Sequence, residues 1–193
     1  MRVIAGSLKG RRLEAPAWEG LRPTSDKLRE TLFNVLAPRI AGASFLDGYA
    51  GSGAVGIEAL SRGAAFVTFV ERDPRAVTLI ETNLKRCAVS DRYAIIRAGF
   101  VDVPARAEGR AFDLVFVDPP YGMREMTQAL DTAAPLVAQD GALVCEHAKR
   151  DAAPPSVRDL MKTRDLISGD SALTFYERLP LPNHDPRAAN RES

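Results

Sequence analysis

The segment Asp118-Pro119-Pro120-Tyr121 places several groups capable of chemistry directly after a hydrophobic strand. Residues 112–117 are almost all apolar, β-branched or aromatic, which is typical of a strand buried on both faces. Neither proline can donate a backbone hydrogen bond, so the strand must end there. Asp118 and the carbonyl of Pro119 can accept hydrogen bonds, and Tyr121 can stack on a flat substrate. Because open α/β sheets bind ligands beyond the carboxyl ends of their strands, we predict a site here. The alternative is that Asp-Pro-Pro only forms a turn.

A second candidate site is the loop Gly51-Ser52-Gly53-Ala54-Val55-Gly56, which has the spacing G-x-G-x-x-G. It follows a short apolar strand at 44–47 and opens a helix expected from about Ala54 to Arg62. Glu71 ends the next expected strand, where an acid of such a motif can bind ribose hydroxyls. This pattern is typical of dinucleotide-binding folds, so an NAD-dependent oxidoreductase is one interpretation. Tight packing of strand and helix without a ligand is another.

Asp47 favours a different cofactor. It ends the strand four residues before Gly51, where its negative charge would oppose a pyrophosphate at the start of the helix. The loop also has no Lys or Arg to bind phosphate. S-adenosylmethionine instead offers an ammonium and a sulfonium for Asp47, a ribose for Glu71, and no phosphate. We therefore predict S-adenosylmethionine as the cofactor, with Asp47, Gly51, Ser52, Gly53 and Glu71 contributing to its binding.

The elements that must position these residues alternate between strand and helix. Beyond the glycine loop we expect strands at 66–70, 93–96, 113–117 and 142–146, helices at 74–86, 124–138 and 157–161, and a closing pair of strands at 165–168 and 172–178. Repeated β-α units of this length require a largely parallel sheet with helices on both faces. The sequence therefore predicts an α/β fold.

The composition fits one globular domain of 193 residues with a hydrophobic core, since 46% of the residues are hydrophobic and 26% are charged. The sequence contains no signal peptide and no apolar run long enough to span a membrane, so we expect a cytoplasmic protein. The two cysteines and two histidines lack the spacing of metal ligands, so no metal is expected.

Positive charge is concentrated at the amino end. Residues 1–22 carry a net charge of +3, whereas the whole chain carries +1. Residues 1–14 suggest a β-hairpin with its turn between Gly6 and Gly10, although a flexible basic tail is an alternative. A helix begins after Thr24 or Ser25, either of which can cap it, and ends at Pro38. Residues 179–193 contain prolines and scattered polar residues that suggest a disordered tail.

The motifs together resemble known enzymes. Residues 46–53 and 118–121 are similar to Rossmann-like class I methyltransferases that modify exocyclic amino groups of bases. Segments 1–6, 9–11, 21–26, 29–34 and 58–64 resemble the RsmD family more narrowly, and the resemblance covers most of residues 1–178. Members of that family methylate the N2 amino group of a guanine in small-subunit (16S) ribosomal RNA.

This resemblance implies a seven-stranded, mostly parallel sheet whose last strand is antiparallel. It also implies an S-adenosylmethionine-dependent methyltransferase domain at 41–178, preceded by an RNA-binding hairpin and helix at 1–40. The expected partner is small-subunit ribosomal RNA, either alone or in an assembled 30S particle, bound by a monomer. The residues expected to contact RNA are basic and lie at the amino end: Arg2, Lys9, Arg11, Arg12 and Arg22.

For such a reaction, Asp118, Pro119 and Tyr121 are the expected catalytic residues. An exocyclic amino group is a poor nucleophile because its lone pair is delocalised into the ring. A carboxylate oxygen of Asp118 and the carbonyl of Pro119 could each accept one N–H of this group and so direct the lone pair at the methyl group. Many relatives place an acid near the adenine of the cofactor where this chain has Gly99-Phe100, so backbone groups or the Phe100 ring are expected to contact the adenine here. Three alternatives stay open: methylation of adenine N6 or cytosine N4, NAD-dependent oxidation, and a non-catalytic RNA-binding assembly factor.

Overall fold

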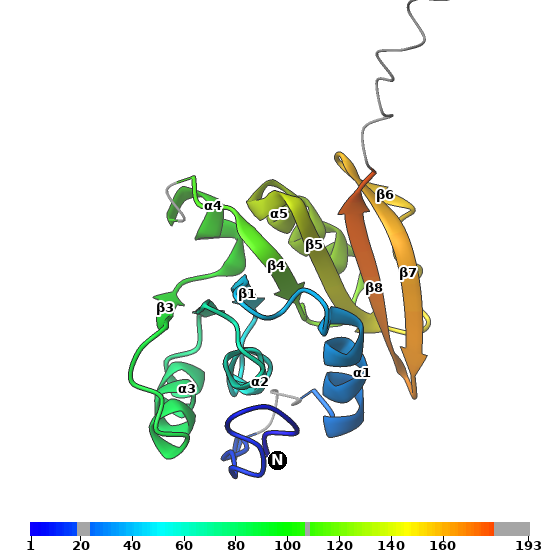
Figure 1. The fold of residues 1–193 in the computed structure, drawn as a ribbon. Helices are drawn as coiled ribbons and strands as arrows, with labels where there is room; N and C mark the ends of the chain where they lie inside the picture. Colours follow the sequence, from blue (N-terminus) through cyan, green and yellow to red (C-terminus); the bar gives the residue numbers. More distant parts are fainter. Residues whose placement is uncertain (19–23, 107–108, 180–193) are drawn as a thin grey trace, which may run out of the picture.

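The fold is built on one mixed β-sheet, seen in the computed structural model, which describes residues 1–18, 24–106 and 109–179. Its strand order is β3-β2-β1-β4-β5-β8-β7-β6 (Figure 1). The strands are β1 (Ser44–Gly48), β2 (Phe66–Glu71), β3 (Tyr93–Arg97), β4 (Phe112–Val117), β5 (Val137–Ala148), β6 (Ser156–Val157), β7 (Leu160–Ser168) and β8 (Ser171–Arg178). Strands β1 to β5 are parallel, and β8 pairs antiparallel with β5.

The predicted α/β fold is confirmed, but the predicted number of seven strands is wrong because the sheet has eight. The additional strand comes from a segment where we expected a helix at 157–161. Instead, β6 and β7 form a tight hairpin in which Arg158 has a φ of 53°. The apolar residues Val157 and Leu160 have helical spacing, but pairing of β7 along the whole of β8 provides the backbone hydrogen bonds.

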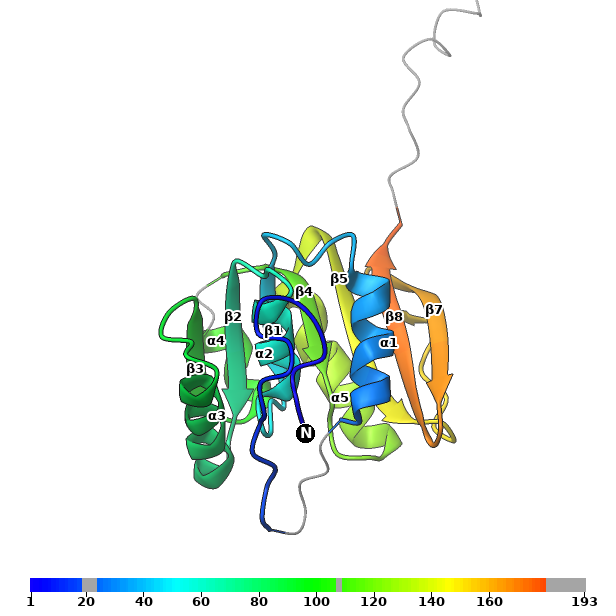
Figure 2. The same cartoon turned by 60° about the horizontal axis from the view of Figure 1, so that its bottom comes forward.

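Helices cover both faces of the sheet (Figure 2). Helices α1 (Asp26–Leu36), α2 (Ala54–Ser61) and α3 (Pro74–Arg86) share one hydrophobic core with one face. Helices α4 (Val103–Arg106) and α5 (Met123–Ala133) contribute to a second core on the other face. The predicted cap of α1 is confirmed, since the Ser25 hydroxyl accepts the backbone N–H of Leu28 at 3.2 Å. No helix within the described ranges is long and apolar enough to cross a membrane.

Two boundaries differ from the prediction. The helix expected at 124–138 ends at Ala133 and is followed by a 3-10 turn, Ala134–Leu136, after which β5 already begins at Val137. Pro135 in that turn lacks a backbone N–H, which explains why the α-helix does not continue. A second 3-10 turn at Phe100–Asp102 and the short helix α4 follow β3 and were not predicted.

Residues 1–14, here called the amino-terminal arm, are folded against the core and are not a flexible tail. The predicted hairpin is present but short, with one antiparallel bridge between Arg2 and Arg12 and backbone hydrogen bonds from Val3 N–H to the Arg11 carbonyl and from Leu13 N–H to the Met1 carbonyl. Glu58 of α2 accepts the backbone N–H groups of Ile4 and Ala5 at 2.8 and 3.0 Å. The arm also buries apolar side chains, those of Val3 and Leu13, in the core shared with α1 and α2. Burial and side-chain acceptors therefore fix the arm together with these few backbone hydrogen bonds.

Candidate active site

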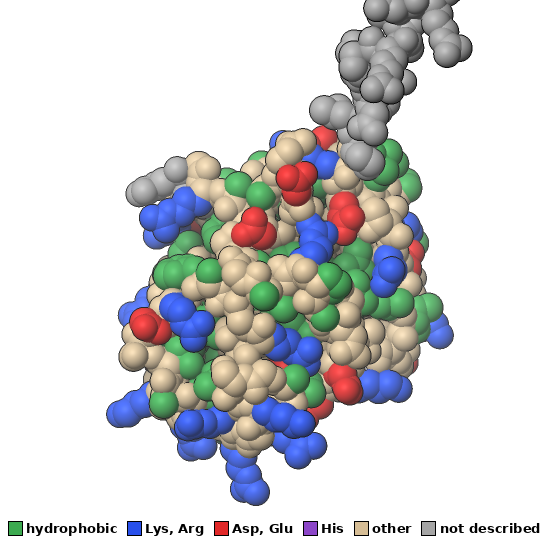
Figure 3. Space-filling view, in the orientation of Figure 1, with side chains coloured by type: hydrophobic (Ala, Val, Ile, Leu, Met, Phe, Trp, Pro, Cys, Tyr) green, Lys and Arg blue, Asp and Glu red, His purple; other side chains and the backbone are tan. Residues whose placement is uncertain are grey.

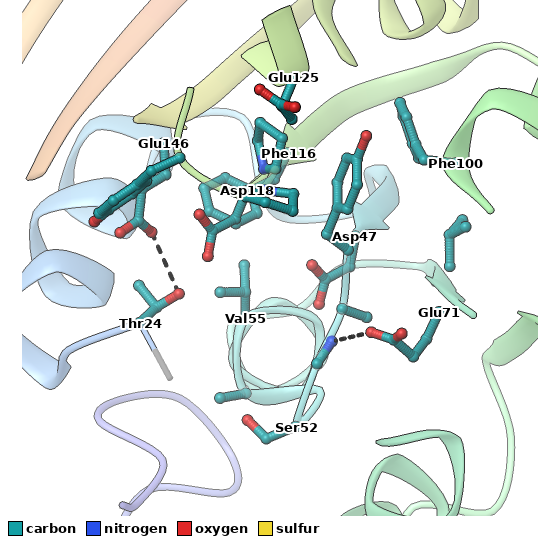
Figure 4. Close-up of a pocket in the computed structure, with 18 of the residues that line it drawn as sticks. Thr24, Asp47, Ser52, Val55, Glu71, Phe100, Phe116, Asp118, Glu125 and Glu146 are labelled. Carbon is teal, nitrogen blue, oxygen red and sulfur yellow. Dashed lines mark hydrogen bonds between the residues drawn. The ribbon is translucent and has the colours of Figure 1, made fainter. Parts of the chain in front are cut away.

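A cavity of about 1240 Å³ lies at the carboxyl ends of β1, β2, β4 and β5. It is lined by nearly all of the predicted cofactor and catalytic residues: Asp47, Gly51, Ser52, Glu71, Phe100, Asp118, Pro119 and Tyr121. Gly53 does not line the cavity; it is the N-cap of α2. The parallel sheet therefore joins two motifs that lie far apart in the sequence, the glycine loop and the segment after β4 (Figure 4).

The glycine loop has the backbone geometry that its sequence suggests. Gly53 has a φ of 76° as the N-cap of α2, a left-handed conformation that favours glycine. Gly56 allows α2 to pack closely on β2, because a Cβ atom there would lie 2.2 Å from the ring of Phe69. Ser52 is buried, and its carbonyl accepts a hydrogen bond from the side-chain amide of Asn83 at 2.9 Å. The loop is therefore held from several sides.

Asp47 is a buried carboxylate at the end of β1, only 1% exposed. Its Oδ2 accepts the backbone N–H of Gly56 at 2.8 Å. Burial raises the pKa of Asp47 to about 8, although the Gly56 hydrogen bond lowers it, and the charge of Glu71 raises it further. A carboxylate in such surroundings gains from a cationic ligand, so the site fits the ammonium and sulfonium of S-adenosylmethionine.

Glu71 is held at the end of β2 by three backbone donors. Its Oε2 accepts the N–H of Gly51 at 2.9 Å, and its Oε1 accepts those of Arg72 and Asp73, both at 2.8 Å. A carboxylate has about four acceptor positions, so Glu71 can accept ribose hydroxyls while these bonds persist. Its fixed position at the loop is the geometry expected for a ribose-binding acid.

Phe100 closes the cavity near the end of β3. Its ring is nearly buried and lies 5.1 Å from the ring of Tyr49, measured between centroids. A Cβ atom at Gly48 would lie 2.6 Å from the Cε2 atom of Phe100. Gly48 therefore provides the space for this ring, which explains why a bulkier residue is absent from a strand that is otherwise fully packed.

The segment after β4, residues 118–121, lines the cavity. Asp118 is half-buried and Pro119 is buried, whereas Tyr121 is 40% exposed. The hydroxyl of Tyr121 is hydrogen-bonded to that of Ser171 at 2.9 Å. This bond connects the segment to β8 and leaves the aromatic ring at the cavity wall.

Sequence reasoning missed other residues that line this cavity. Glu146, at the end of β5, is 5% exposed and accepts the Thr24 hydroxyl at 3.3 Å (Figure 4). Ser171 lines it from β8 and Thr24 from the start of α1. One signal in the sequence could have indicated Glu146 as a site residue. It ends the predicted strand 142–146, and the predicted site acids Asp47, Glu71 and Asp118 also lie at the ends of predicted strands.

The basic residues of the arm lie outside the cavity. Arg2, Lys9, Arg11 and Arg12 are exposed, and within the described part of the chain none of them forms an ion pair. Figure 3 shows Lys and Arg side chains gathered along the lower edge of this view, over the arm and α3. Arg22 lies outside the described residues.

No group of three or more His, Cys, Asp or Glu side chains that could hold a metal occurs in the ranges 1–18, 24–106 and 109–179. Cys87 and Cys145 are buried free thiols.

Comparisons with known proteins agree with this architecture. A family model described as "Conserved hypothetical protein 95" matches residues 1–177. The chain belongs to this family. Ribosomal RNA small subunit methyltransferase D of Escherichia coli K12 is 36% identical over 180 residues, covering 92% of this chain and 90% of the relative. The same-named protein of Haemophilus influenzae is 42% identical over 132 residues, covering 67% of this chain and 68% of the relative.

The solved structure of yhhF from Escherichia coli superposes with a TM-score of 0.81 at 33% identity, covering 92% of this chain and 97% of that one. A solved structure from Pyrococcus horikoshii at 18% identity superposes with a TM-score of 0.72, covering 88% of this chain and 95% of that one, and the fold is that of class I methyltransferases. The resemblance to the RsmD family that the sequence suggests is therefore confirmed.

Proposed function

We propose that this protein transfers a methyl group from S-adenosylmethionine to the N2 amino group of a guanine in small-subunit ribosomal RNA. Membership of a family whose relatives are named as small-subunit ribosomal RNA methyltransferases supports the coarser assignment, an S-adenosylmethionine-dependent rRNA methyltransferase. The observation that carries the proposal is one cavity lined both by Asp47, Glu71 and the glycine loop and by Asp118, Pro119 and Tyr121.

Asp47 and Glu71 are proposed to hold the cationic and ribose parts of the cofactor, with Gly51, Ser52 and Gly53 shaping the loop and Phe100 contacting the adenine. When bound, S-adenosylmethionine supplies a methyl group on a positively charged sulfur. Asp118 accepts one N–H of the guanine N2 and the carbonyl of Pro119 accepts the other, which directs the nitrogen lone pair at the methyl group. Formation of the N–C bond would break the methyl–sulfur bond and leave S-adenosylhomocysteine as the product, while the amino group would lose one proton. Asp118 is the group proposed to receive that proton.

Tyr121 is proposed to stack on the guanine, which must leave its own stack first. Stacking of this kind contributes about 1–3 kcal/mol in comparable sites. The exposed basic residues of the arm, together with Arg22, are proposed to contact RNA phosphates. We further propose that residues 1–40 act as the RNA-binding extension of a cytoplasmic monomer whose substrate is free rRNA or the assembled 30S particle.

The proposal is tested by incubating the protein with methyl-labelled S-adenosylmethionine and small-subunit particles that lack the modification. Label should appear on one guanine, at N2, and mapping that nucleotide identifies the substrate. Label on adenine or cytosine, or on DNA, would contradict the guanine assignment. A thermal shift assay with S-adenosylmethionine and with NAD separates a methyltransferase from an oxidoreductase. We expect S-adenosylmethionine, but not NAD, to raise the melting temperature.

Asp118→Ala tests the catalytic role directly. We expect turnover to fall about a thousandfold or more, because Asp118 is both a hydrogen-bond acceptor for the reacting amino group and the proposed acceptor of its proton. Cofactor affinity, measured by isothermal titration calorimetry, should change less than about threefold. A parallel loss of cofactor binding would mean that Asp118 serves the cofactor and not the base. An intact cellular phenotype in this variant would favour a non-catalytic assembly factor.

A further inference from the structure

Glu146 is a second carboxylate beside Asp118 in the cavity. Strands β4 and β5 pair in parallel with Val117 opposite Cys145, so Asp118 and Glu146 follow on neighbouring strands. Because side chains alternate between the faces of a sheet, Asp118 and Glu146 lie on the same face. Figure 4 shows the two carboxylates at the same end of the cavity.

The position of Glu146 is fixed from two directions. Its backbone is held within the sheet, paired with Leu173 of β8. Its Oε2 accepts the hydroxyl of Thr24, which lies just before α1, 122 residues earlier in the chain. A carboxylate has about four acceptor positions in total, so Glu146 can accept a further N–H from a substrate. Because Glu146 lines the cavity, a base that reaches Asp118 also comes within its reach.

Guanine differs from the other amino-bearing bases in the atom beside its amino group. Next to N2 it has N1–H, a donor, whereas adenine has the N1 acceptor next to N6 and cytosine has the N3 acceptor next to N4. A carboxylate only accepts hydrogen bonds, so it bonds to N1–H but faces a repelling lone pair in adenine or cytosine. Asp118 and the Pro119 carbonyl act on the amino group itself, which all three bases possess, and therefore cannot make this distinction.

On the basis of the guanine-N2 function proposed above, we propose that Glu146 accepts the N1–H of the target guanine and thereby selects guanine over adenine and cytosine. Thr24 is a positioning residue that holds the Glu146 carboxylate toward the base. Glu146 is thus a specificity-determining residue, and Asp118 acts on the nitrogen that reacts.

The test uses 2-aminopurine, which keeps the amino group but has an acceptor at N1. Small-subunit particles are reassembled around RNA carrying guanine or 2-aminopurine at the methylated position, and kcat/KM is measured for each. The wild type should prefer guanine. Glu146→Gln can present either an oxygen or an N–H to position 1, so it should lower the guanine/2-aminopurine ratio by about tenfold or more. The two bases differ in intrinsic reactivity, but this difference affects the ratio in the wild type and in the variant equally. It therefore cancels when the two ratios are compared.

Glu125→Gln is the matched control, because Glu125 is an exposed carboxylate that lines the same cavity from α5. It loses the same charge and should leave the ratio unchanged. Thr24→Val removes only the hydroxyl that orients Glu146 and should lower the ratio about threefold. It also provides a second readout if Glu146→Gln does not fold, which melting temperature and cofactor affinity would reveal.

The outcomes separate this inference from the function on which it rests. If the wild type methylates no guanine, the proposed function fails. If it methylates guanine but Glu146→Gln lowers kcat/KM equally for both bases, Glu146 is merely structural and the inference is overturned. An unchanged ratio in Thr24→Val, where that variant alone can be assayed, overturns it as well.

Discussion

Two buried carboxylates, Glu58 and Asp47, lie close together around α2 but have different hydrogen-bond surroundings. Glu58, with 0% exposure, accepts two backbone N–H groups of the arm and the Nε–H of Arg62 at 2.8 Å. Asp47, equally buried, accepts one backbone N–H from Gly56 within the described residues, and burial raises its pKa to about 8. The first acid has its donors within the fold, whereas the second lines a cavity and forms no ion pair with any Lys or Arg in the part of the chain that the structure describes.

This difference teaches how to interpret a buried acid. A charge that is fully hydrogen-bonded by the protein fastens one segment to another, as Glu58 fastens the arm to α2. Charge buried with few donors at a cavity wall is costly until a cation arrives. Changes at the two acids should therefore separate stability from ligand binding.

The largest effect is expected at Asp47. Asp47→Ala should weaken S-adenosylmethionine binding by roughly a hundredfold or more, because the ligand cation loses its buried counter-charge. The free energy of unfolding should not fall in parallel, since a costly buried acid is removed. Isothermal titration calorimetry and urea unfolding measure the two quantities. If Asp47→Ala lowered the free energy of unfolding as much as Glu58→Ala does, the two acids would not differ in the way proposed here.

The next effect is expected at Glu58. Glu58→Ala should lower the free energy of unfolding by about 2–4 kcal/mol, because Ile4 N–H, Ala5 N–H and Arg62 lose a buried acceptor. Urea denaturation provides the measurement. The matched control is Glu177→Ala, which breaks a half-exposed ion pair with Arg39 and should cost less than about 1 kcal/mol. Equal losses in both variants would show that the arm contacts contribute little.

The outer face of the arm should behave unlike its anchored inner face. Charge reversal of Arg11 and Arg12 should weaken RNA binding about tenfold or more and reduce its salt dependence, because phosphate contacts are lost. Unfolding free energy and cofactor affinity should stay close to wild type. Filter binding over a range of salt concentrations measures the effect. If RNA affinity does not change, the arm is only a structural element of the fold.

The last prediction concerns pH. The pKa of Asp47 is raised from about 4 in the unfolded chain to about 8 in the fold. The folded state therefore binds an additional proton between these values, and stability falls as pH rises through this window. The ligand-free wild type should lose more melting temperature between pH 5 and pH 8 than Asp47→Asn does. Parallel curves for the two proteins would mean that Asp47 is already ionised at pH 5.

Sequence patterns predicted the parts of the site in which local chemistry is sufficient. The glycines at 51, 53 and 56 imply a tight turn and close helix packing, and both are present. The prolines after Val117 end β4 where expected. The segment 157–161 was misjudged because its helical spacing was a local signal, while the pairing of β7 with β8 was decided by residues further along the chain.

What the sequence determined by itself was most of the order of strands and helices, the glycine loop and the acid that follows β4, because these depend on residues close together in the chain. The tertiary structure decided which distant groups meet. It brought Glu58 to Ile4 of the arm, 54 residues away, and Thr24 to Glu146, 122 residues away. Such meetings depend on strand register and on which faces are buried. Local propensity does not encode either of them, so the second carboxylate beside Asp118 became visible only in the fold.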